Sequence, residues 1–283
     1  MSSQITSIAV SALHPFAGNP FESSTADVAA LAASIQDTGL IEPLIVRLKA
    51  GRYEIIAGHR RWAAATQLGM EEVPCLIREY TDEQAVILLV TSNMTQRTSI
   101  PAGEYAIAVK MMMDACRHQG TNQSDATAGE RANAWVAKQL NVSVARVKAN
   151  VRTAELDPAL LHLYAIGRMP LSAASALHDL SSDWQRQLAK FLTDRPTKLT
   201  YAVARQLVIA YKNRQLTQES MQDLLYPPAL QPEEKKSDKA IRLSFDPKAL
   251  RPFVDITASP DKIQQEILRL LKIALPDAAL SDE

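Results

Sequence analysis

Long apolar runs are missing from this 283-residue sequence. The longest one, Ala85 to Val90, is far too short for a bilayer, because a membrane-spanning helix needs about 20 apolar residues. The first residues, Met1 to Val10, lack the charged-then-apolar order of a secretion signal. We therefore expect a cytoplasmic protein without a membrane segment.

Cysteine, aromatic residues and net charge are also scarce. The two cysteines, Cys75 and Cys116, form no Cys-x-x-Cys pair, which favours reduced thiols in a cytosolic compartment. Basic and acidic residues number 31 each, so the formal net charge is zero and a generic basic coat for nucleic acid is absent. No phosphate-loop signature, zinc-ligand spacing or nucleophile elbow is present, so an enzyme of small-molecule metabolism lacks support.

The charge is nevertheless unevenly distributed. From Asn141 to Gln215 the sequence has 11 Lys and Arg against 5 Asp and Glu, a local net charge of +6. A basic middle in a neutral chain indicates one face built for phosphates. A solvated helical face gives the same count, so the charge alone leaves both interpretations open.

Changes in composition divide the chain into three segments. We predict an α+β domain over residues 1–118, a Gly-, Thr-, Ser- and Asn-rich connector over 119–130, and an all-helical domain over 131–225. Residues 226–239 contain three prolines and a charge cluster, and indicate a linker. The final segment, 240–283, is too short to bury much core by itself, so we expect it to form a dimer or to pack on the middle domain.

Apolar spacing and turn residues predict the elements of these segments. In the first, we expect strands at 44–48, 53–57 and 73–78, and helices at 27–38, 62–68, 82–90 and 101–117. Gly39 and Gly69 are expected to end two of these helices. In the last segment, we expect a strand from Ile241 to Phe245 and an amphipathic helix from Pro260 to Leu275.

A helix-turn-helix is predicted from Trp135 to Thr153. The apolar positions in this stretch suit two short helices that cross at a tight turn, and Asn141 tolerates the left-handed backbone such a turn needs. Ser143 is a good N-cap for the second helix. Two ordinary packed helices with a polar outer face would show the same pattern.

The second helix is expected to expose side chains that suit a DNA groove. Arginine can pair with guanine and asparagine with adenine in the major groove, while further cations hold phosphates. We expect Ser143, Arg146 and Asn150 near bases, Lys148 and Arg152 on phosphates, and Ala145 on the same DNA-binding face.

Several stretches of the first segment, in order, resemble the ParB family of partition proteins. Leu31 to Val46 resembles the first box of that family, Ile55 to Ala65 the second, and Ser92 to Arg97 the third. The helix-turn-helix follows where the family has its DNA-binding module. The resemblance covers about residues 8–195. It implies an α+β ParB-type N-terminal nucleotide-binding domain, an all-α helix-turn-helix domain and a small C-terminal α/β dimerisation segment.

The resemblance also implies a function and a set of site residues. ParB-like N-terminal domains bind CTP with Mg²⁺, and nucleotide and cognate DNA together close a homodimer into a clamp that slides on DNA. A ParA-type ATPase is the usual partner. The implied nucleotide-binding residues include a base-side pair, a phosphate cradle and a magnesium ligand, Asn93; the set is Gly39, Pro43, Gly58, His59, Arg60, Arg61, Asn93 and Arg97.

This sequence departs from the family pattern at three places. His59 and Ser92 stand where many members have glutamate, and those carboxylates are linked to nucleotide turnover. We therefore predict CTP binding with slow or absent hydrolysis, which leaves a weak CTPase activity open. Phe21 follows Asn19 and Pro20 where relatives often have arginine, which puts one phosphate contact in doubt.

Two other functions remain open at this stage. A related transcriptional repressor would use the same helix-turn-helix without a role in segregation. A ParB-like nuclease would need clustered carboxylates or a histidine nucleophile around a metal, and the first segment has only the scattered Asp37, Glu42 and His59.

Overall fold

The computed structural model of the chain describes residues 5–119, 128–195 and 197–226, together with 262, 265, 266 and 269. The chain divides into two units, Met1–Pro228 and Ala229–Glu283. The four described positions of the second unit are helical and fall within the helix predicted from Pro260 to Leu275. The rest of the predicted C-terminal dimerisation segment, including the strand at 241–245, lies outside the described residues. So do the predicted linker after Tyr226 and residues 120–127 of the predicted connector.

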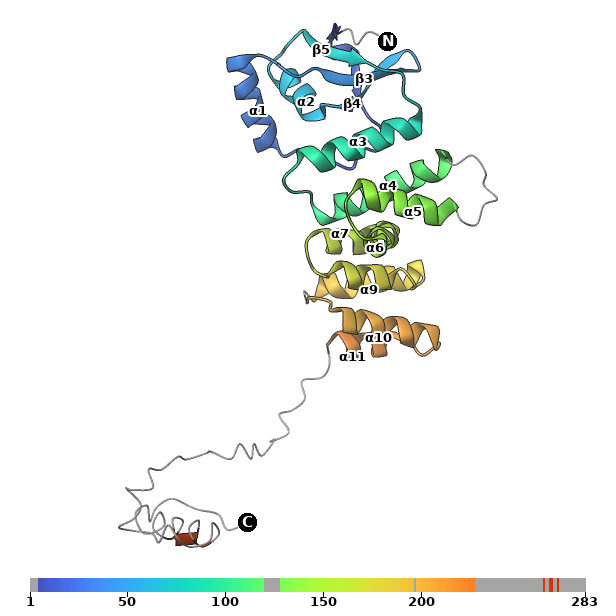
Figure 1. Ribbon diagram of the computed structural model, residues 1–283. Coiled ribbons are helices and arrows are strands. Elements are labelled where there is room, and N and C mark those ends of the chain that lie inside the picture. The colour runs from blue at the N-terminus through green and yellow to red at the C-terminus, as the bar shows by residue number, and fades with distance from the viewer. Residues whose placement is uncertain are drawn as a thin grey trace. The chain divides into compact units, whose positions relative to one another are not determined.

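The first unit begins with a five-stranded mixed sheet (Figure 1). Its strands are β1 (Ile5–Ala9), β2 (Leu13–Pro15), β3 (Leu44–Lys49), β4 (Arg52–Ala57) and β5 (Glu72–Ile77), in the order β1-β5-β3-β4-β2. A short 3-10 helix, Val10–Ala12, joins the first two strands. The pairs β1–β5 and β3–β4 are antiparallel, and the pairs β3–β5 and β2–β4 are parallel.

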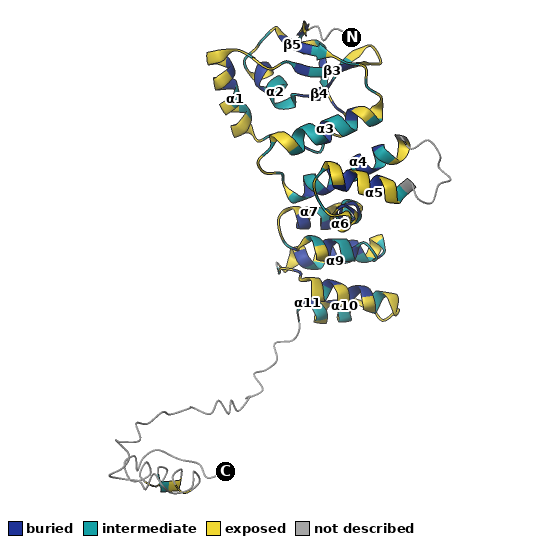
Figure 2. Ribbon diagram, viewed as in Figure 1, coloured by how far each residue is buried: buried dark blue, intermediate teal, exposed yellow. Residues whose placement is uncertain are grey.

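Helices cover both faces of the sheet. Neighbouring side chains of a strand point to opposite faces, and in β4 both Ile55 and Ile56 are fully buried. Ile55 packs in a core that includes Ala65 of α2 (His59–Gln67), whereas Ile56 packs with Leu89 of α3 (Asp82–Gln96). Helix α1 (Thr25–Thr38) packs on α2 and buries only Ala32 and Ile35, so most of its surface is exposed (Figure 2).

The remaining described helices form an all-α region. They are α4 (Ala102–Gln119), α5 (Ala128–Gln139), α6 (Val144–Ala154), α7 (Pro158–Ala165), α8 (Leu171–Leu177), α9 (Ser182–Asp194), α10 (Tyr201–Lys212) and α11 (Gln218–Leu225). One leucine-rich core joins α7 to α11. A second core runs from the sheet through α3 and α4 to α5 and α6, and contains Ile56, Leu89, Met112 and Val147. The α+β part and the first helices of the all-α part therefore share one continuous core.

The predicted fold class agrees with these elements. An α+β domain precedes an all-helical one, and each predicted strand and helix of the first segment has a counterpart. Helix α3 extends beyond Val90 to Gln96, and in this added part the hydroxyl groups of Thr91, Ser92 and Thr95 donate to carbonyls three or four residues earlier in the helix. Within the described residues, no helix is long and apolar enough to cross a membrane.

Candidate anion site and candidate nucleic-acid interface

Helix α2 begins at a position that only a glycine can occupy without strain. Gly58, its N-cap, has a φ of 101°, and a Cβ atom there would lie 3.1 Å from Leu44 Cγ. A side chain would therefore be both strained and crowded. The first N–H groups of an α-helix have no partner within the helix and attract anions. The bare backbone at Gly58 lets Leu44 and Arg61 pack closely against the start of α2.

Two arginines stand beside this helix end, and one of them, Arg60, keeps an unpaired donor. Arg60, in the first turn of α2, has a buried Nε with no hydrogen-bond partner, and its Nη2 is 4.0 Å from Asp27 Oδ1 of α1. Arg97, which ends α3, is close enough for the charges of Arg60 and Asp27 to shift its pKa. Burial is the main cause that lowers the pKa of Arg97, and Glu104 opposes it. A buried donor without a partner and two neighbouring guanidinium groups fit a multivalent anion such as a phosphate chain.

Arg61 is engaged by the backbone of a neighbouring loop. Its Nη1 donates to Glu42 O at 2.7 Å and to Pro43 O at 3.0 Å, and lies 3.3 Å from Glu42 Oε2. These bonds tie the start of α2 to the loop that follows Gly39, whose φ of 76° ends α1. The structure thus brings Pro43 and Arg61 together, with the guanidinium of Arg61 holding the loop that begins after Gly39.

His59 is an uncharged acceptor in this arrangement. Its Nε2 accepts a hydrogen bond from the Phe16 N–H at 3.2 Å. Burial, and then the positive charge of Arg97, lower the pKa of His59 from 6.5 to about 4. The imidazole therefore brings no positive charge to a phosphate near neutral pH; it links α2 to the segment after β2.

Asn93 lies on α3 next to the anion site. Its Nδ2 donates to Leu89 O at 2.9 Å, and its Oδ1 accepts from Arg97 Nε at 3.1 Å. Nowhere in the described part of the chain do three His, Cys, Asp or Glu side chains gather as metal ligands. Mg²⁺ is usually held by one or two carboxylates together with substrate phosphates. The residues present therefore fit an anion, and the Oδ1 of Asn93 is engaged by Arg97.

The predicted helix-turn-helix is formed by α5 and α6. Asn141 in the turn has a φ of 52°, the left-handed conformation expected of it. The Ser143 side chain caps α6, since its Oγ accepts the Arg146 N–H at 3.2 Å. Ala137 is buried between the helices. The geometry of the turn, the cap and the second helix agrees with the prediction.

The N-terminal half of α6 is exposed, but the predicted exposed face is wrong at one position. Ser143, Ala145, Arg146 and Lys148 are exposed. Asn150 is only 1% exposed, and its Nδ2 donates to Arg146 O at 2.8 Å, so it does not present its amide to a base. Asn150 belongs to the buried stripe of α6, because it follows the buried Val147 by three residues and directly precedes the buried Val151.

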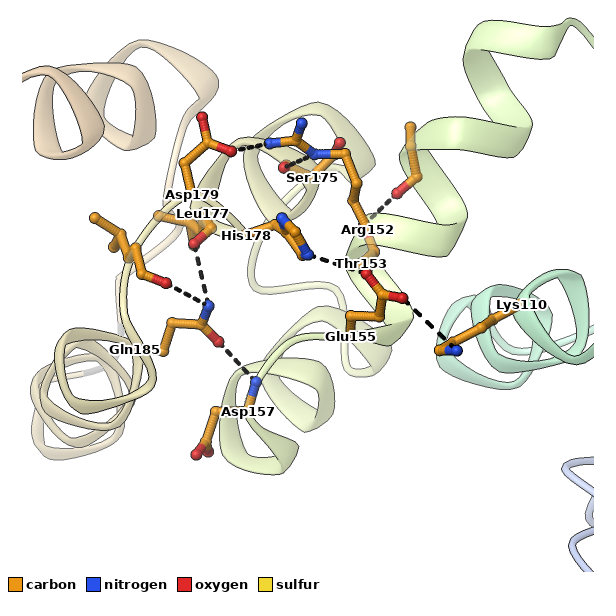
Figure 3. Close-up of polar contacts among 12 residues, drawn as sticks. Lys110, Arg152, Thr153, Glu155, Asp157, Ser175, Leu177, His178, Asp179 and Gln185 are labelled. Carbon is orange, nitrogen blue, oxygen red and sulfur yellow. Dashed lines mark hydrogen bonds and ion pairs between the residues drawn. The ribbon is translucent and has the colours of Figure 1, made fainter. Parts of the chain in front are cut away.

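The C-terminal half of α6 is held by a polar network (Figure 3). Arg152 Nε donates to Ser175 O of α8 at 3.1 Å, and Nη2 pairs with Asp179, whose other oxygen pairs with Lys212 of α10. Glu155, at the end of α6, pairs with His178 at 3.0 Å and Lys110 of α4 at 3.6 Å. Arg152, predicted on a phosphate, is therefore engaged within the protein.

Two contacts at the start of α4 were not predicted. Glu104 Oε2 is buried without a hydrogen-bond partner, 3.7 Å from Arg97 Nη1. The adjacent Tyr105 has the guanidinium carbon of Arg146 5.9 Å from its ring centroid. The Tyr105–Arg146 contact joins residues far apart in the sequence, and the Arg97–Glu104 contact crosses from the end of α3 to the start of α4, so neither follows from the pattern of a single helix.

Comparisons with known proteins agree with this arrangement of parts. Residues 1–94 match the family described as ParB N-terminal domain. A probable chromosome-partitioning protein ParB of Coxiella burnetii is 33% identical over 165 residues, which cover 58% of this chain and 52% of the relative. A nucleoid occlusion protein of Halalkalibacterium halodurans is 31% identical over 212 residues, which cover 74% of this chain and 65% of the relative.

A solved structure is also similar. A C-terminally truncated chromosome-partitioning protein ParB of Caulobacter crescentus, complexed to the centromeric parS site, has 22% sequence identity and a TM-score of 0.43. The match covers 72% of this chain and 98% of that one. The chain spans between about half and two thirds of the length of the curated relatives above.

Fold and sites together define a class of protein in which an α+β domain with a glycine-led, arginine-flanked helix end precedes a helix-turn-helix domain. Residues 1–94 match the ParB N-terminal domain, and the curated relatives extend the similarity over 58% to 74% of this chain.

Proposed function

We propose that this chain is a partition protein that recognises a centromere-like DNA site with α6 and binds CTP at the N-terminus of α2. The observation that carries the proposal is the presence of two unlike sites in one continuous unit. One is a glycine-led helix end flanked by Arg60 and Arg97; the other is an exposed helix start with Arg146 and Lys148.

The chemistry of each site supports its role. A triphosphate needs backbone N–H groups and cationic side chains with free hydrogen-bond donors. The start of α2 after Gly58 supplies the N–H groups, and Arg60 supplies the cation. A duplex groove needs a helix whose first turns project, which α6 supplies from Ser143 to Lys148. The closing of a homodimer into a clamp and the partnership with a ParA-type ATPase belong to the same proposal, because both accompany CTP binding in the family.

Two finer points of the proposal concern the chemistry of the nucleotide. The predicted Mg²⁺ remains a prediction. Asn93 Oδ1 accepts a hydrogen bond from Arg97 Nε, and this bond would have to break before the oxygen could bind the metal ion. Slow or absent CTP hydrolysis also stays a prediction. In its favour, His59 is a neutral acceptor of a backbone N–H and Ser92 Oγ donates to Leu89 O, so neither offers the negative charge of a carboxylate.

Reciprocal substitutions test the two roles. The DNA site is first selected from a random duplex pool with the full chain. Arg146→Ala should weaken binding to that site by about 10- to 100-fold, the range for loss of a bidentate base contact, and leave CTP affinity unchanged. Arg60→Ala should weaken CTP binding and leave DNA binding without nucleotide unchanged.

Arg205→Ala provides the matched control, since Arg205 is exposed on α10 at the other end of the all-α region. It should change neither affinity. If Arg146→Ala and Arg60→Ala each abolished both activities in folded protein, the assignment of separate sites would be wrong.

A further inference from the structure

The guanidinium of Arg146 lies beside an aromatic ring that α4 supplies. Arg146 Cζ is 5.9 Å from the centroid of the Tyr105 ring, within the distance at which a cation is attracted to an aromatic face. Arg146 is exposed, whereas Tyr105 is half-buried and packs against the core shared by α3 to α6. The ring therefore belongs to the rigid surface beside the recognition helix.

The position of that ring is fixed by close packing of α4. The Tyr105 N–H donates to Pro101 O at 2.9 Å in the first turn of the helix. Two residues before Tyr105, a Cβ atom at Gly103 would lie 2.8 Å from Ala165 Cβ of α7, so only glycine allows this approach. Lys110, further along α4, pairs with Glu155 at the other end of α6. Helix α4 thus contacts both ends of α6.

A ring in this place can prepare an arginine for base recognition. A free arginine side chain has many rotamers, and ordering them on binding costs affinity. Stacking uses the flat face of the guanidinium and leaves its edge of N–H donors free for the two acceptors of a guanine. The positive charge of Arg146 also acts on the hydroxyl of Tyr164: burial raises the pKa of that hydroxyl and Arg146 lowers it.

We infer that Tyr105 is a positioning residue for DNA recognition, which holds the Arg146 guanidinium in the orientation that reaches a base edge. The inference rests on the proposed function of α6 and adds to it a residue outside the helix-turn-helix. The residue acts through Arg146 and touches no base itself.

The test compares four variants of the full chain on the selected DNA site and on a scrambled duplex. Tyr105→Leu removes the ring and should reduce the preference for the cognate site about two- to fivefold, the range for one exposed cation–π contact. Tyr105→Phe keeps the ring and should retain the preference. Tyr105→Leu combined with Arg146→Ala should bind no more weakly than Arg146→Ala alone, because the ring then has no guanidinium to hold.

A matched control is available elsewhere in the chain. Arg195 lies over the ring of Tyr226, with 5.4 Å between its Cζ and the ring centroid, beyond the helix-turn-helix. Tyr226→Leu removes the same kind of contact and should leave the DNA preference unchanged. Thermal melting of each variant checks folding, and Tyr105→Met replaces Tyr105→Leu if the latter does not fold.

Each outcome distinguishes the inference from the function on which it rests. If Arg146→Ala leaves DNA binding intact, the proposed role of α6 is wrong. If Arg146→Ala weakens binding but the losses from Tyr105→Leu and Arg146→Ala simply add, or Tyr105→Phe behaves like Tyr105→Leu, the positioning role is wrong.

Discussion

Four arginines of the α+β domain differ in how their charge is used. Arg47 is 3% exposed and pairs with Glu54 and Asp82, so its charge is compensated inside the fold. Arg61 donates hydrogen bonds from its Nη1 to two loop carbonyls. Arg60 keeps a buried Nε without a partner, and Arg97 shares its charge between Glu104 and the face of Phe21. Among these four, only Arg60 has a buried donor without an acceptor, which makes it the strongest candidate for an anion ligand.

His59 gives the α+β domain a defined sensitivity to acid. Its pKa is lowered from 6.5 to about 4 in the folded chain. Below pH 6.5 His59 is therefore protonated in the unfolded chain but still neutral in the folded chain. The free energy of unfolding thus decreases as the pH falls toward 4. Above pH 6.5 both states are neutral at this residue and the effect vanishes. We expect a loss of roughly 1–2 kcal/mol at pH 5 relative to pH 7.5.

The substitution His59→Gln isolates this contribution, because glutamine can still accept the Phe16 N–H but cannot be protonated. Urea denaturation of both proteins from pH 7.5 to pH 5 gives the measurement. The variant should lose less stability than the parent over this interval. Parallel pH dependences for the two proteins would show that His59 is not held neutral by the fold.

At the scale of elements, the two halves of α6 serve different purposes. The first half is exposed from Val144 to Arg146, where a ligand can reach it. The second half is attached to α8 by Arg152, to α10 through the shared Asp179, and to α4 through Glu155. The carboxylate of Asp179 holds Arg152 in place, and the hydrogen bond from Lys212 is the main cause that lowers the pKa of Asp179. Anchoring at one end leaves the other end free for recognition.

Substitutions in the two halves should therefore separate stability from DNA affinity. Arg152→Ala removes an ion pair and a hydrogen bond, and should lower the free energy of unfolding by about 1 kcal/mol, with little change in the DNA affinity of the folded protein. Lys148→Ala, on the exposed side, should leave stability unchanged and reduce the salt dependence of DNA binding by about one phosphate contact. Chemical denaturation and DNA titration at several salt concentrations measure both. The reverse pattern would return Arg152 to the phosphate role predicted from the sequence.

Regular elements could be predicted because their causes are local. Apolar alternation found β3, β4 and β5, and the glycine at position 39 marked the end of α1. Ser143 and Asn141 marked the turn and the start of α6. Strands β1 and β2 were not located individually: β2 is only Leu13–Pro15, too short for a periodic signal, and β1 is an edge strand.

What could not be predicted depends on tertiary contacts. Asn150 is polar and was assigned to the exposed face, but α6 packs against both α4 and α8 and so buries a wider stripe than one helix partner would require. Its position between Val147 and Val151 carried the missed signal. The pairings of Arg152 with Asp179 and of Arg146 with Tyr105 join distant parts of the chain, and only the folded structure brings them together.

At the scale of the whole unit, one core links the two proposed sites. Met112 and Met113 of α4 are fully buried in the cluster that also contains Ile56 of the sheet and Val147 of α6. The connector predicted over 119–130 therefore does not separate two independent cores, because α4 precedes it and packs with α5 and α6 after it. We expect the α+β domain and the helix-turn-helix to unfold together.

The three tryptophans of the chain allow this expectation to be measured. Trp62 lies in α2, Trp135 in α5 and Trp184 in α9. The three reporters thus stand in the α+β domain, the helix-turn-helix and the last helices of the all-α region. In variants that keep a single tryptophan, the others replaced by phenylalanine, the reporters at 62 and 135 should give the same denaturation midpoint. Met112→Ala should lower both midpoints together, by an amount equivalent to roughly 2–4 kcal/mol, because a buried methionine side chain is lost from the shared core.

Leu207→Ala is the matched control for Met112→Ala, since Leu207 is fully buried in the other core, formed by α7 to α11. It should lower the midpoint reported by Trp184 at least as much as that reported by Trp62. Were the reporters at 62 and 135 to melt separately, with Met112→Ala moving only one of them, the two sites would sit on independent domains. An effect of CTP binding at α2 on DNA binding at α6 would then have to pass through the segment that joins α3 to α4, because the two domains would share no core.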